Sequence, residues 1–281
     1  IIWIGLGSAG FYQYNSNTGV YTHNRQLPDF KMLNEIPTVN SIVQSKRDGS
    51  IWIGTHGTGV IIYYPNKPSG QRIINYNQNN LSTLPHGCVF SMLEDKSYNF
   101  WLGTKGGLCI CTPNGKSVGF ASTKIDNIPL NTFAIVSIIQ RRSEEIWLGT
   151  SNGGILRAIG SLKQLDKLRF INYTPVKKNL NNISILCLFE DSKRRLWAGT
   201  DGGGLSLFDE KKNMFIPVHD TFNLPGDAIF SIQEDKQHNL WMSSNAGLIK
   251  LIVPDNLNEV SYRLYTRHDG LQDNLCNRNA H

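Results

Sequence analysis

The sequence has no long apolar run. No stretch of the 281-residue chain approaches the ~20 apolar residues that a membrane-spanning helix needs. The first ten residues, IIWIGLGSAG, carry no charged leader and are typical of a strand. We therefore expect a soluble chain, with neither a signal peptide nor a membrane anchor in the sequence as given.

Cysteine is scarce and irregularly spaced. Five cysteines occur, at Cys88, Cys109, Cys111, Cys187 and Cys276, and they are too few and too irregular for a disulfide framework. Cys109 and Cys111 alternate along a predicted strand, where neighbours on one face rarely form a disulfide. We expect small buried hydrophobic side chains at these positions, and they indicate no cellular compartment.

The motifs of common hydrolytic and metal sites are absent from the sequence. The seven histidines show no HxH or HExxH spacing, no GxSxG occurs, and no pair of carboxylates stands apart. The net charge of +6 is spread over short turns such as KRRL and QRRS, without the basic stripe that tracks nucleic acid. The sequence predicts no catalytic residue, metal, cofactor or nucleic-acid partner. Its excess of basic over acidic residues permits an acidic ligand such as a uronic acid.

One sequence motif is repeated along the chain. A tryptophan followed by small residues recurs in IIWIGLGSAGFYQY, SIWIGTHGTGVIIYY, NFWLGTKGGLCIC, EIWLGTSNGGILRA, RLWAGTDGGGLSLFD and NLWMSSNAGLIKL. These copies use all six tryptophans, which are Trp3, Trp52, Trp101, Trp147, Trp197 and Trp241, at separations of 49, 49, 46, 50 and 44 residues. A period of about 40 to 50 residues is typical of propeller blades. We therefore expect a single propeller, or most of one, over residues 1–281.

Each repeat contains four β-type runs. In the third copy they are CVFSMLED (88–95), NFWLGT, GLCICTP and GFAST (119–123), with polar turns between them. The pattern predicts an all-β protein, a β-propeller of four-stranded antiparallel blades with about six repeats. We expect the tryptophans to fill the space between blades and the glycines after them to form tight turns of positive φ. The ED pairs that begin at Glu94, Glu190 and Glu234 recur, so we expect structural hairpin turns there and not catalytic acids.

The segment ISILCLFEDSKRRLWAGTDGGGLSLFD resembles the two-component regulator propeller repeat. That repeat is found in extracytoplasmic sensor regions of hybrid two-component systems, especially those of gut Bacteroidetes. The last segment, YTRHDGLQDNLCNRNAH (265–281), is similar to the stretch that enters the final blade in this family, ahead of an Ig-like domain, a membrane helix and a histidine kinase. The resemblance implies a periplasmic sensor, with a second propeller and an Ig-like domain in the same polypeptide and a homodimer in the full-length protein.

The family's propellers have seven blades, whereas this chain contains about six units. The chain starts at the second strand of one blade and stops in the first strand of another. Two arrangements stay open: a strand near Leu275 completes the first blade of a six-fold ring, or a blade is missing and leaves a sheet edge.

Two sets of loops in a four-stranded blade emerge on one face, and this face usually carries binding sites. They are the turns between second and third strands and the connections from each outer strand to the next inner strand. Their amides, carboxylates and cations suit sugar hydroxyls or an acidic sugar. The candidate ligand-binding residues are His56, His86, Lys105, Asn152, Asn182, Asp201, Asp227 and Asn245.

These patterns favour an extracytoplasmic sensor propeller of a hybrid two-component signalling protein, which recognises an oligosaccharide and signals to a downstream histidine kinase. The isolated propeller would then not be an enzyme. Two other hypotheses stay open because a fold does not fix a function: a propeller lyase or glycan-cleaving enzyme, and a purely structural interaction module. Glycan turnover that is lost on substitution of Asp201 or His86 would favour the enzyme, and the structural module predicts no small-molecule binding.

Overall fold

Strands are the main secondary structure of the protein. The structure is a computed structural model that describes residues 1–7, 10–27, 38–65, 71–74, 84–120 and 123–273. Within these ranges the single α-helix, α1 (Pro175–Lys178), is one turn long, and no helix is long and apolar enough to cross a bilayer. The chain forms two compact units: unit 1 is Ile1–Ile135 with Gly160–Leu168, and unit 2 is Val136–Ile159 with Arg169–His281.

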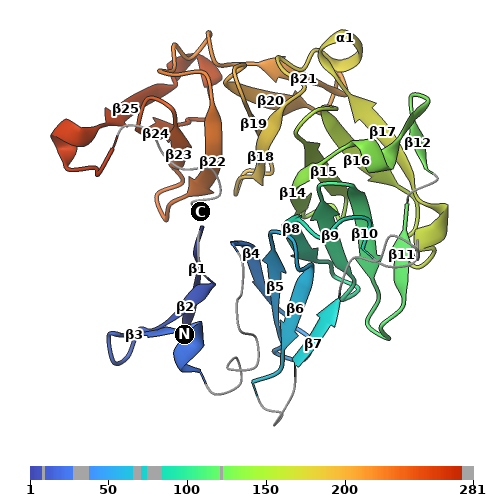
Figure 1. Cartoon of the computed structure of the whole chain (residues 1–281). Helices are drawn as coiled ribbons and strands as arrows, with labels where there is room; N and C mark the ends of the chain where they lie inside the picture. The colour runs from blue at the N-terminus through green and yellow to red at the C-terminus, as the bar shows by residue number, and fades with distance from the viewer. Residues whose placement is uncertain (8–9, 28–37, 66–70, 75–83, 121–122, 274–281) are drawn as a thin grey trace. The chain divides into compact units, whose positions relative to one another are not determined.

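Unit 1 contains three sheets, each a meander of consecutive strands (Figure 1). The first sheet has three strands, β1 (Ile2–Gly5), β2 (Phe11–Asn15) and β3 (Val20–His23). The second has β4 (Val39–Gln44), β5 (Ile51–Thr55), β6 (Val60–Tyr63) and β7 (Gln71–Ile74). The third has β8 (Val89–Glu94), β9 (Phe100–Thr104), β10 (Gly107–Cys111) and β11 (Ser117–Gly119), and a two-stranded ribbon follows, β12 (Lys124–Ile125) and β13 (Ile128–Pro129).

Unit 2 contains three more sheets of the same plan. The fourth sheet has β14 (Ile135–Gln140), β15 (Ile146–Thr150), β16 (Ile155–Ile159) and β17 (Arg169–Tyr173). The fifth has β18 (Ile185–Glu190), β19 (Leu196–Thr200), β20 (Leu205–Asp209) and β21 (Met214–Pro217). The sixth has β22 (Ile229–Glu234), β23 (Leu240–Ser244), β24 (Leu248–Ile252) and β25 (Ser261–Tyr265). Six repeated blade sheets confirm the predicted fold class, an all-β propeller.

The second strand of each blade carries its tryptophan into the core. Trp101, Trp147 and Trp197 have no exposed surface, whereas Trp3 and Trp241 are half-buried. In unit 2, Trp197 belongs to one core cluster with aliphatic side chains of the following sheet, which include Leu240, Met242 and Ile249. Apolar side chains from successive blades therefore form a shared core, as the repeat predicts.

The glycines after each tryptophan serve two purposes. Gly202 and Gly204 have φ of +93° and +65°, which confirms the predicted tight turn between β19 and β20. Gly199, inside β19, has a different role, which the sequence analysis missed. A Cβ atom there would lie 2.7 Å from the Ile229 carbonyl oxygen of the next inner strand, so glycine is required for the close approach of two blades.

One predicted strand is displaced. The outer strand of the third blade was expected at residues 119–123, but β11 covers Ser117–Gly119 because the short turn after β10 pairs Cys111 with Ser117 and Cys109 with Gly119. Cys109 and Cys111 are buried thiols outside any disulfide, as predicted, and Cys88 is buried as well. Cys276 and the proposed closing strand near Leu275 lie outside the described residues, and the number of domains stays a prediction.

Candidate functional site

The two predicted sets of loops meet in both units. In unit 1, the turn after β5 reaches the connection that enters β8, and His56 and Cys88 form an antiparallel bridge. In unit 2, Asp201, in the turn after β19, forms the same type of bridge with Ala228, in the connection that enters β22. These two turns thus lie beside the connections into the next blades, so residues from adjacent repeats share a loop surface within each unit.

Unit 1 brings together three of the candidate residues, His56, His86 and Lys105, which we call the basic cluster. His56 and Lys105 are exposed and His86 is half-buried. Burial lowers the pKa of His86, and the nearby positive charges of Lys105 and His56 lower it further. Its Nδ1 accepts a hydrogen bond from the Cys88 backbone at 2.9 Å, so a neutral His86 carries its proton on Nε2. The cluster can attract an anion through Lys105 and donate a hydrogen bond from His86.

Unit 2 holds the remaining candidates, and four of them form an amide–carboxylate cluster: Asn182, Asp201, Asp227 and Asn245. Asn182 Nδ2 donates to the Asp201 carbonyl at 2.7 Å. Asn245 Nδ2 donates to Asp227 Oδ1 at 2.8 Å, while its Oδ1 accepts from the Asp227 backbone at 3.1 Å. These amides hold the loops in shape, so part of their polarity is structural. A role in ligand binding stays a prediction, as it does for Asn152, which lies exposed in the turn after β15.

Two buried polar atoms of the same blade have spare hydrogen-bonding capacity. Within the part of the chain that the structure describes, Asn181 Nδ2 and His219 Nδ1 are buried and have no hydrogen-bond partner. Asn181 Oδ1 accepts from Ser206 Oγ at 2.7 Å. Buried groups of this kind are satisfied by water or by a ligand. The sequence analysis did not select His219, because nothing in the sequence distinguishes it from an ordinary loop histidine.

At the other end of the strands, glutamates connect adjacent blades. The glutamate at the end of an inner strand accepts a hydrogen bond from a backbone N–H in the first hairpin of the preceding blade. We call this contact the glutamate bridge. It joins Glu94 to Lys46 at 2.6 Å, Glu190 to Arg142 at 2.7 Å and Glu234 to Ser192 at 2.8 Å. The aspartates that follow Glu94, Glu190 and Glu234 accept from the indole N–H groups of Trp101, Trp197 and Trp241 at 2.8, 2.9 and 2.9 Å, which confirms the structural role predicted for the ED pairs.

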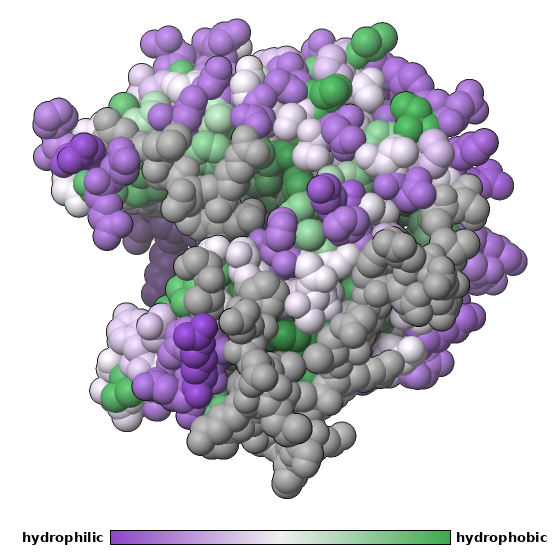
Figure 2. All heavy atoms as spheres, viewed as in Figure 1, coloured by the Kyte–Doolittle hydropathy of each residue, from purple (hydrophilic) through white to green (hydrophobic). Residues whose placement is uncertain are grey.

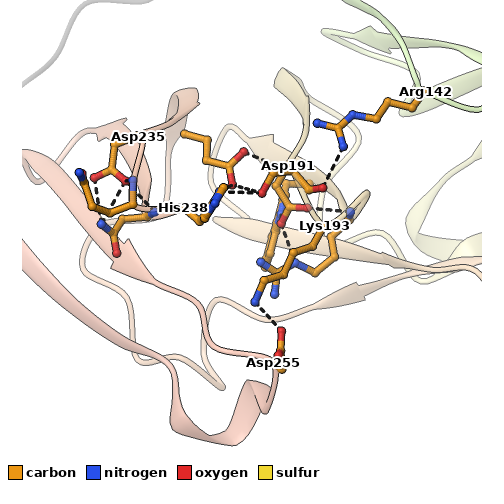
Figure 3. Close-up of polar contacts among 12 residues, drawn as sticks. Arg142, Asp191, Lys193, Asp235, His238 and Asp255 are labelled. Carbon is orange, nitrogen blue, oxygen red and sulfur yellow. Dashed lines mark hydrogen bonds and ion pairs between the residues drawn. The ribbon is translucent and has the colours of Figure 1, made fainter.

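Figure 3 shows this hairpin network in unit 2, where Asp191, Asp235 and His238 lie among contacts from neighbouring hairpins. Ser192 Oγ lies 2.9 Å from His238 Nδ1 and 2.5 Å from Glu234 Oε1. A catalytic triad needs the serine and the acid on different ring nitrogens, but here Glu234 Oε1 also lies on Nδ1, at 3.1 Å. The geometry is that of a polar bridge between blades. Across the described residues, no group of three or more His, Cys, Asp and Glu side chains could hold a metal ion.

A cleft at the hairpin end of unit 1 was not predicted from the sequence. It has a volume of about 210 Å³ and lies between the second and third sheets. Its lining includes Arg47 and Asp48 of one hairpin, Tyr98 of the next, and the rings of Trp52 and Phe100. On the face drawn in Figure 2, hydrophobic residues form small separate groups among hydrophilic ones. The cleft combines an aromatic lining with the charged side chains of Arg47 and Asp48.

The repeats match a known family. The model of the family described as "Two component regulator propeller" matches residues 83–106, 179–202 and 223–246. Each match begins in the connection before an inner strand, runs through β8–β9, β18–β19 or β22–β23, and ends in the turn after the second strand. Three of the repeats are thus similar to the two-component regulator propeller repeat.

The chain is similar to Histidine kinase P4 of Formosa agariphila, at 25% identity over 285 residues. The alignment covers 100% of the chain and 20% of that kinase, so the chain spans a fifth of its relative's length. Among solved structures it is similar to PorZ, a surface component of the type-IX secretion system of Porphyromonas gingivalis, with a TM-score of 0.69 at 16% identity over 97% of the chain and 41% of PorZ. It is also similar to an extracellular domain from B. thetaiotaomicron that is assigned to a hybrid two component system, with a TM-score of 0.46 at 21% identity over 98% of the chain and 36% of that domain. At these identities the likeness to PorZ shows the fold alone.

Proposed function

We propose that this propeller is an extracytoplasmic sensor module of a hybrid two-component signalling protein and that it recognises an oligosaccharide. One observation carries the proposal: three repeats match the regulator propeller family, in a chain that aligns from end to end with part of a histidine kinase. The proposal includes a periplasmic location, a second propeller and an Ig-like domain in the same polypeptide, and a homodimer.

The two loop clusters supply the chemistry that such recognition needs. The amides and carboxylates of the unit 2 cluster suit hydroxyl groups, and the basic cluster of unit 1 suits the carboxylate of an acidic sugar. Binding can change the output of a kinase only if the oligosaccharide has different affinities for two arrangements of the sensor. The proposal therefore requires a ligand that the propeller holds without converting it.

A thermal-shift screen of the 281-residue chain against neutral and acidic oligosaccharides tests the proposal. A ligand that binds only the folded state stabilises it by ~2.7 kcal/mol at a hundredfold excess over Kd, which raises the unfolding temperature measurably. The proposal predicts a shift with one class of glycan, and the glycan stays intact. Cleavage of that glycan would instead support a lyase or glycan-cleaving enzyme, and the absence of any shift would support a structural module.

A further inference from the structure

We infer that the cleft at the hairpin end of unit 1 is a binding site for a single saccharide ring, separate from the loop clusters. This inference rests on the proposed function, which names an oligosaccharide as the ligand. It adds the place where one ring of that oligosaccharide binds. The site is formed by two adjacent blades, through the hairpin that contains Arg47 and Asp48 and the hairpin that contains Tyr98.

The cleft has an aromatic floor and an exposed aromatic edge. The rings of Trp52 and Phe100 stack on each other at 3.7 Å with an interplanar angle of 5°, and both are at least nine-tenths buried. Tyr98 is different, because 45% of its surface is exposed. An exposed tyrosine beside a polar cleft offers an apolar face for the C–H groups of a sugar and a hydroxyl group for hydrogen bonding.

The backbone of Tyr98 is unusual for so large a residue. Its φ is +62°, in the left-handed region that bulky side chains seldom adopt. The same turn position has positive φ in the other four-stranded blades, where it is held by Gly49, Glu144, Arg194 and His238. The turn geometry is therefore common to the repeats, and a tyrosine at this position is specific to the blade that borders the cleft. The positive φ is therefore a property of the hairpin, and what distinguishes this blade is the exposed tyrosine ring that the turn presents.

Two charged groups of the cleft are fixed in place. Arg47 Nη1 donates to the Pro113 carbonyl at 2.7 Å, and Arg47 Nη2 donates to Asp48 Oδ2 at 3.1 Å. Asp48 Oδ1 also accepts hydrogen bonds from the backbone and the hydroxyl group of Ser50, at 3.1 and 2.6 Å. Burial raises the pKa of Asp48, but these hydrogen bonds outweigh it and lower the pKa to about 2. The carboxylate therefore stays ionised at physiological pH.

The pair of Arg47 and Asp48 favours hydroxyl groups over an ion. The two charges compensate each other, so neither an anion nor a cation gains a net attraction from the pair. A guanidinium has five N–H donors, and the contacts to Pro113 and Asp48 use two of them. Asn114 also lines the cleft and adds an amide with two N–H donors, while its Oδ1 accepts from Thr112 Oγ1. Donors and acceptors without net charge around an aromatic face match a polyhydroxylated ring.

The size of the cleft sets the size of its ligand. Pockets for drug-sized molecules have volumes of roughly 300–1,000 Å³, and the cleft, at about 210 Å³, is smaller. It therefore takes one ring, and the rest of an oligosaccharide extends into solvent or along the surface. This limit also makes monosaccharides suitable probes.

The test is an NMR titration of the 281-residue chain with glucose, galactose, mannose, glucuronic acid and galacturonic acid. We expect one neutral sugar to cause saturable shifts of the Arg47, Asp48 and Tyr98 amides. Tyr98→Asn removes the ring but keeps a residue that tolerates positive φ, and we expect it to weaken binding at least tenfold. Arg47→Gln, a second variant that leaves the turn intact, should weaken binding similarly.

The matched control is Arg194→Asn, which makes the same replacement at the same turn position of another blade, and its Kd should equal that of the wild type. Unchanged affinity in both cleft variants, or shifts confined to the loop clusters, would overturn the inference while the proposed function stands. If oligosaccharides stabilise the chain but no monosaccharide shifts the cleft amides, the inference alone fails. If neither monosaccharides nor oligosaccharides bind, the inference and the proposed function both fail.

Discussion

A hydrogen bond between an aspartate and a tryptophan is a residue-level contact that three of the blades share. Asp191 illustrates it best. Its side chain is fully buried, accepts from the Trp197 indole at 2.9 Å and from the Arg195 backbone at 2.8 Å, and forms an ion pair with the Arg195 side chain. One carboxylate thus fixes the hairpin and orients the large core side chain of the blade. Removal of such an acceptor leaves buried donors without partners.

We expect Asp191→Ala to destabilise the protein by about 3 kcal/mol, since it leaves the Trp197 indole N–H unsatisfied and Arg195 unpaired. The thermal unfolding midpoint should fall by roughly 6 °C. Asp220→Ala, at an exposed aspartate of the same blade, is the control and should leave the midpoint nearly unchanged. Equal midpoints for the two variants would show that the aspartate–tryptophan contact contributes little.

Asp48 gives a residue-level prediction for pH. Its folded-state pKa of about 2 lies below the value of ~3.9 expected in the unfolded chain, so the unfolded state binds the proton more readily. Asp48 therefore stabilises the fold above about pH 4, and this contribution is lost as the pH falls toward about 2.

A carboxyl-detected NMR titration measures the pKa of Asp48 directly. We expect a midpoint near pH 2 in the wild type, and a higher midpoint in Ser50→Ala because that variant removes one of the hydrogen bonds to the carboxylate. An ordinary midpoint in the wild type would mean that these hydrogen bonds do not form in solution.

The glutamate bridges connect one element to the next. Glu94, at the end of β8, is 7% exposed and accepts from Ser45 Oγ at 2.7 Å and from the Lys46 backbone at 2.6 Å. Both donors belong to the hairpin between β4 and β5, so the contact holds two consecutive sheets at a fixed separation. Its equivalents in unit 2 make this a repeated device and not a local accident.

We expect Glu94→Gln to lower the free energy of unfolding by about 1–3 kcal/mol. The amide nitrogen of glutamine accepts no hydrogen bond, so one of the two donors loses its acceptor. Ser45→Ala should lower it by less. Since the two residues share one contact, the double variant should be less destabilised than the sum of the single variants, by about 1 kcal/mol. Strict additivity in denaturant unfolding would contradict the bridge.

Features within one repeat could be predicted from the sequence, and contacts between repeats largely could not. The regular spacing of the six tryptophans predicted the blades, and the β-type runs of each repeat predicted strands such as β18 and β22. Strand order alone predicted that the turn containing His56 and the connection before β8 lie on one face, and the bridge between His56 and Cys88 was not predicted. The cleft was missed because Arg47 and Pro113 are 66 residues apart, and no local pattern indicates their contact. The second role of glycine in β19 was missed for the same reason, since it depends on the neighbouring blade.

At the scale of the whole chain, the two units carry candidate binding residues of different types. The basic cluster belongs to unit 1, and the amide–carboxylate cluster belongs to unit 2. Under the proposed function the two units offer different recognition chemistry, and a ligand with different affinities for two states of the sensor would shift the equilibrium between those states. This is the physical requirement for a signal, and it needs no chemical conversion of the ligand.

Isothermal titration calorimetry with the glycan that most stabilises the chain, followed by analysis of that glycan for new chain ends, shows whether the propeller binds an oligosaccharide without cleaving it. We expect saturable binding of the oligosaccharide and full recovery of intact ligand. Continuous heat from turnover with new chain ends, or no binding across neutral and acidic glycans, would contradict the proposed function.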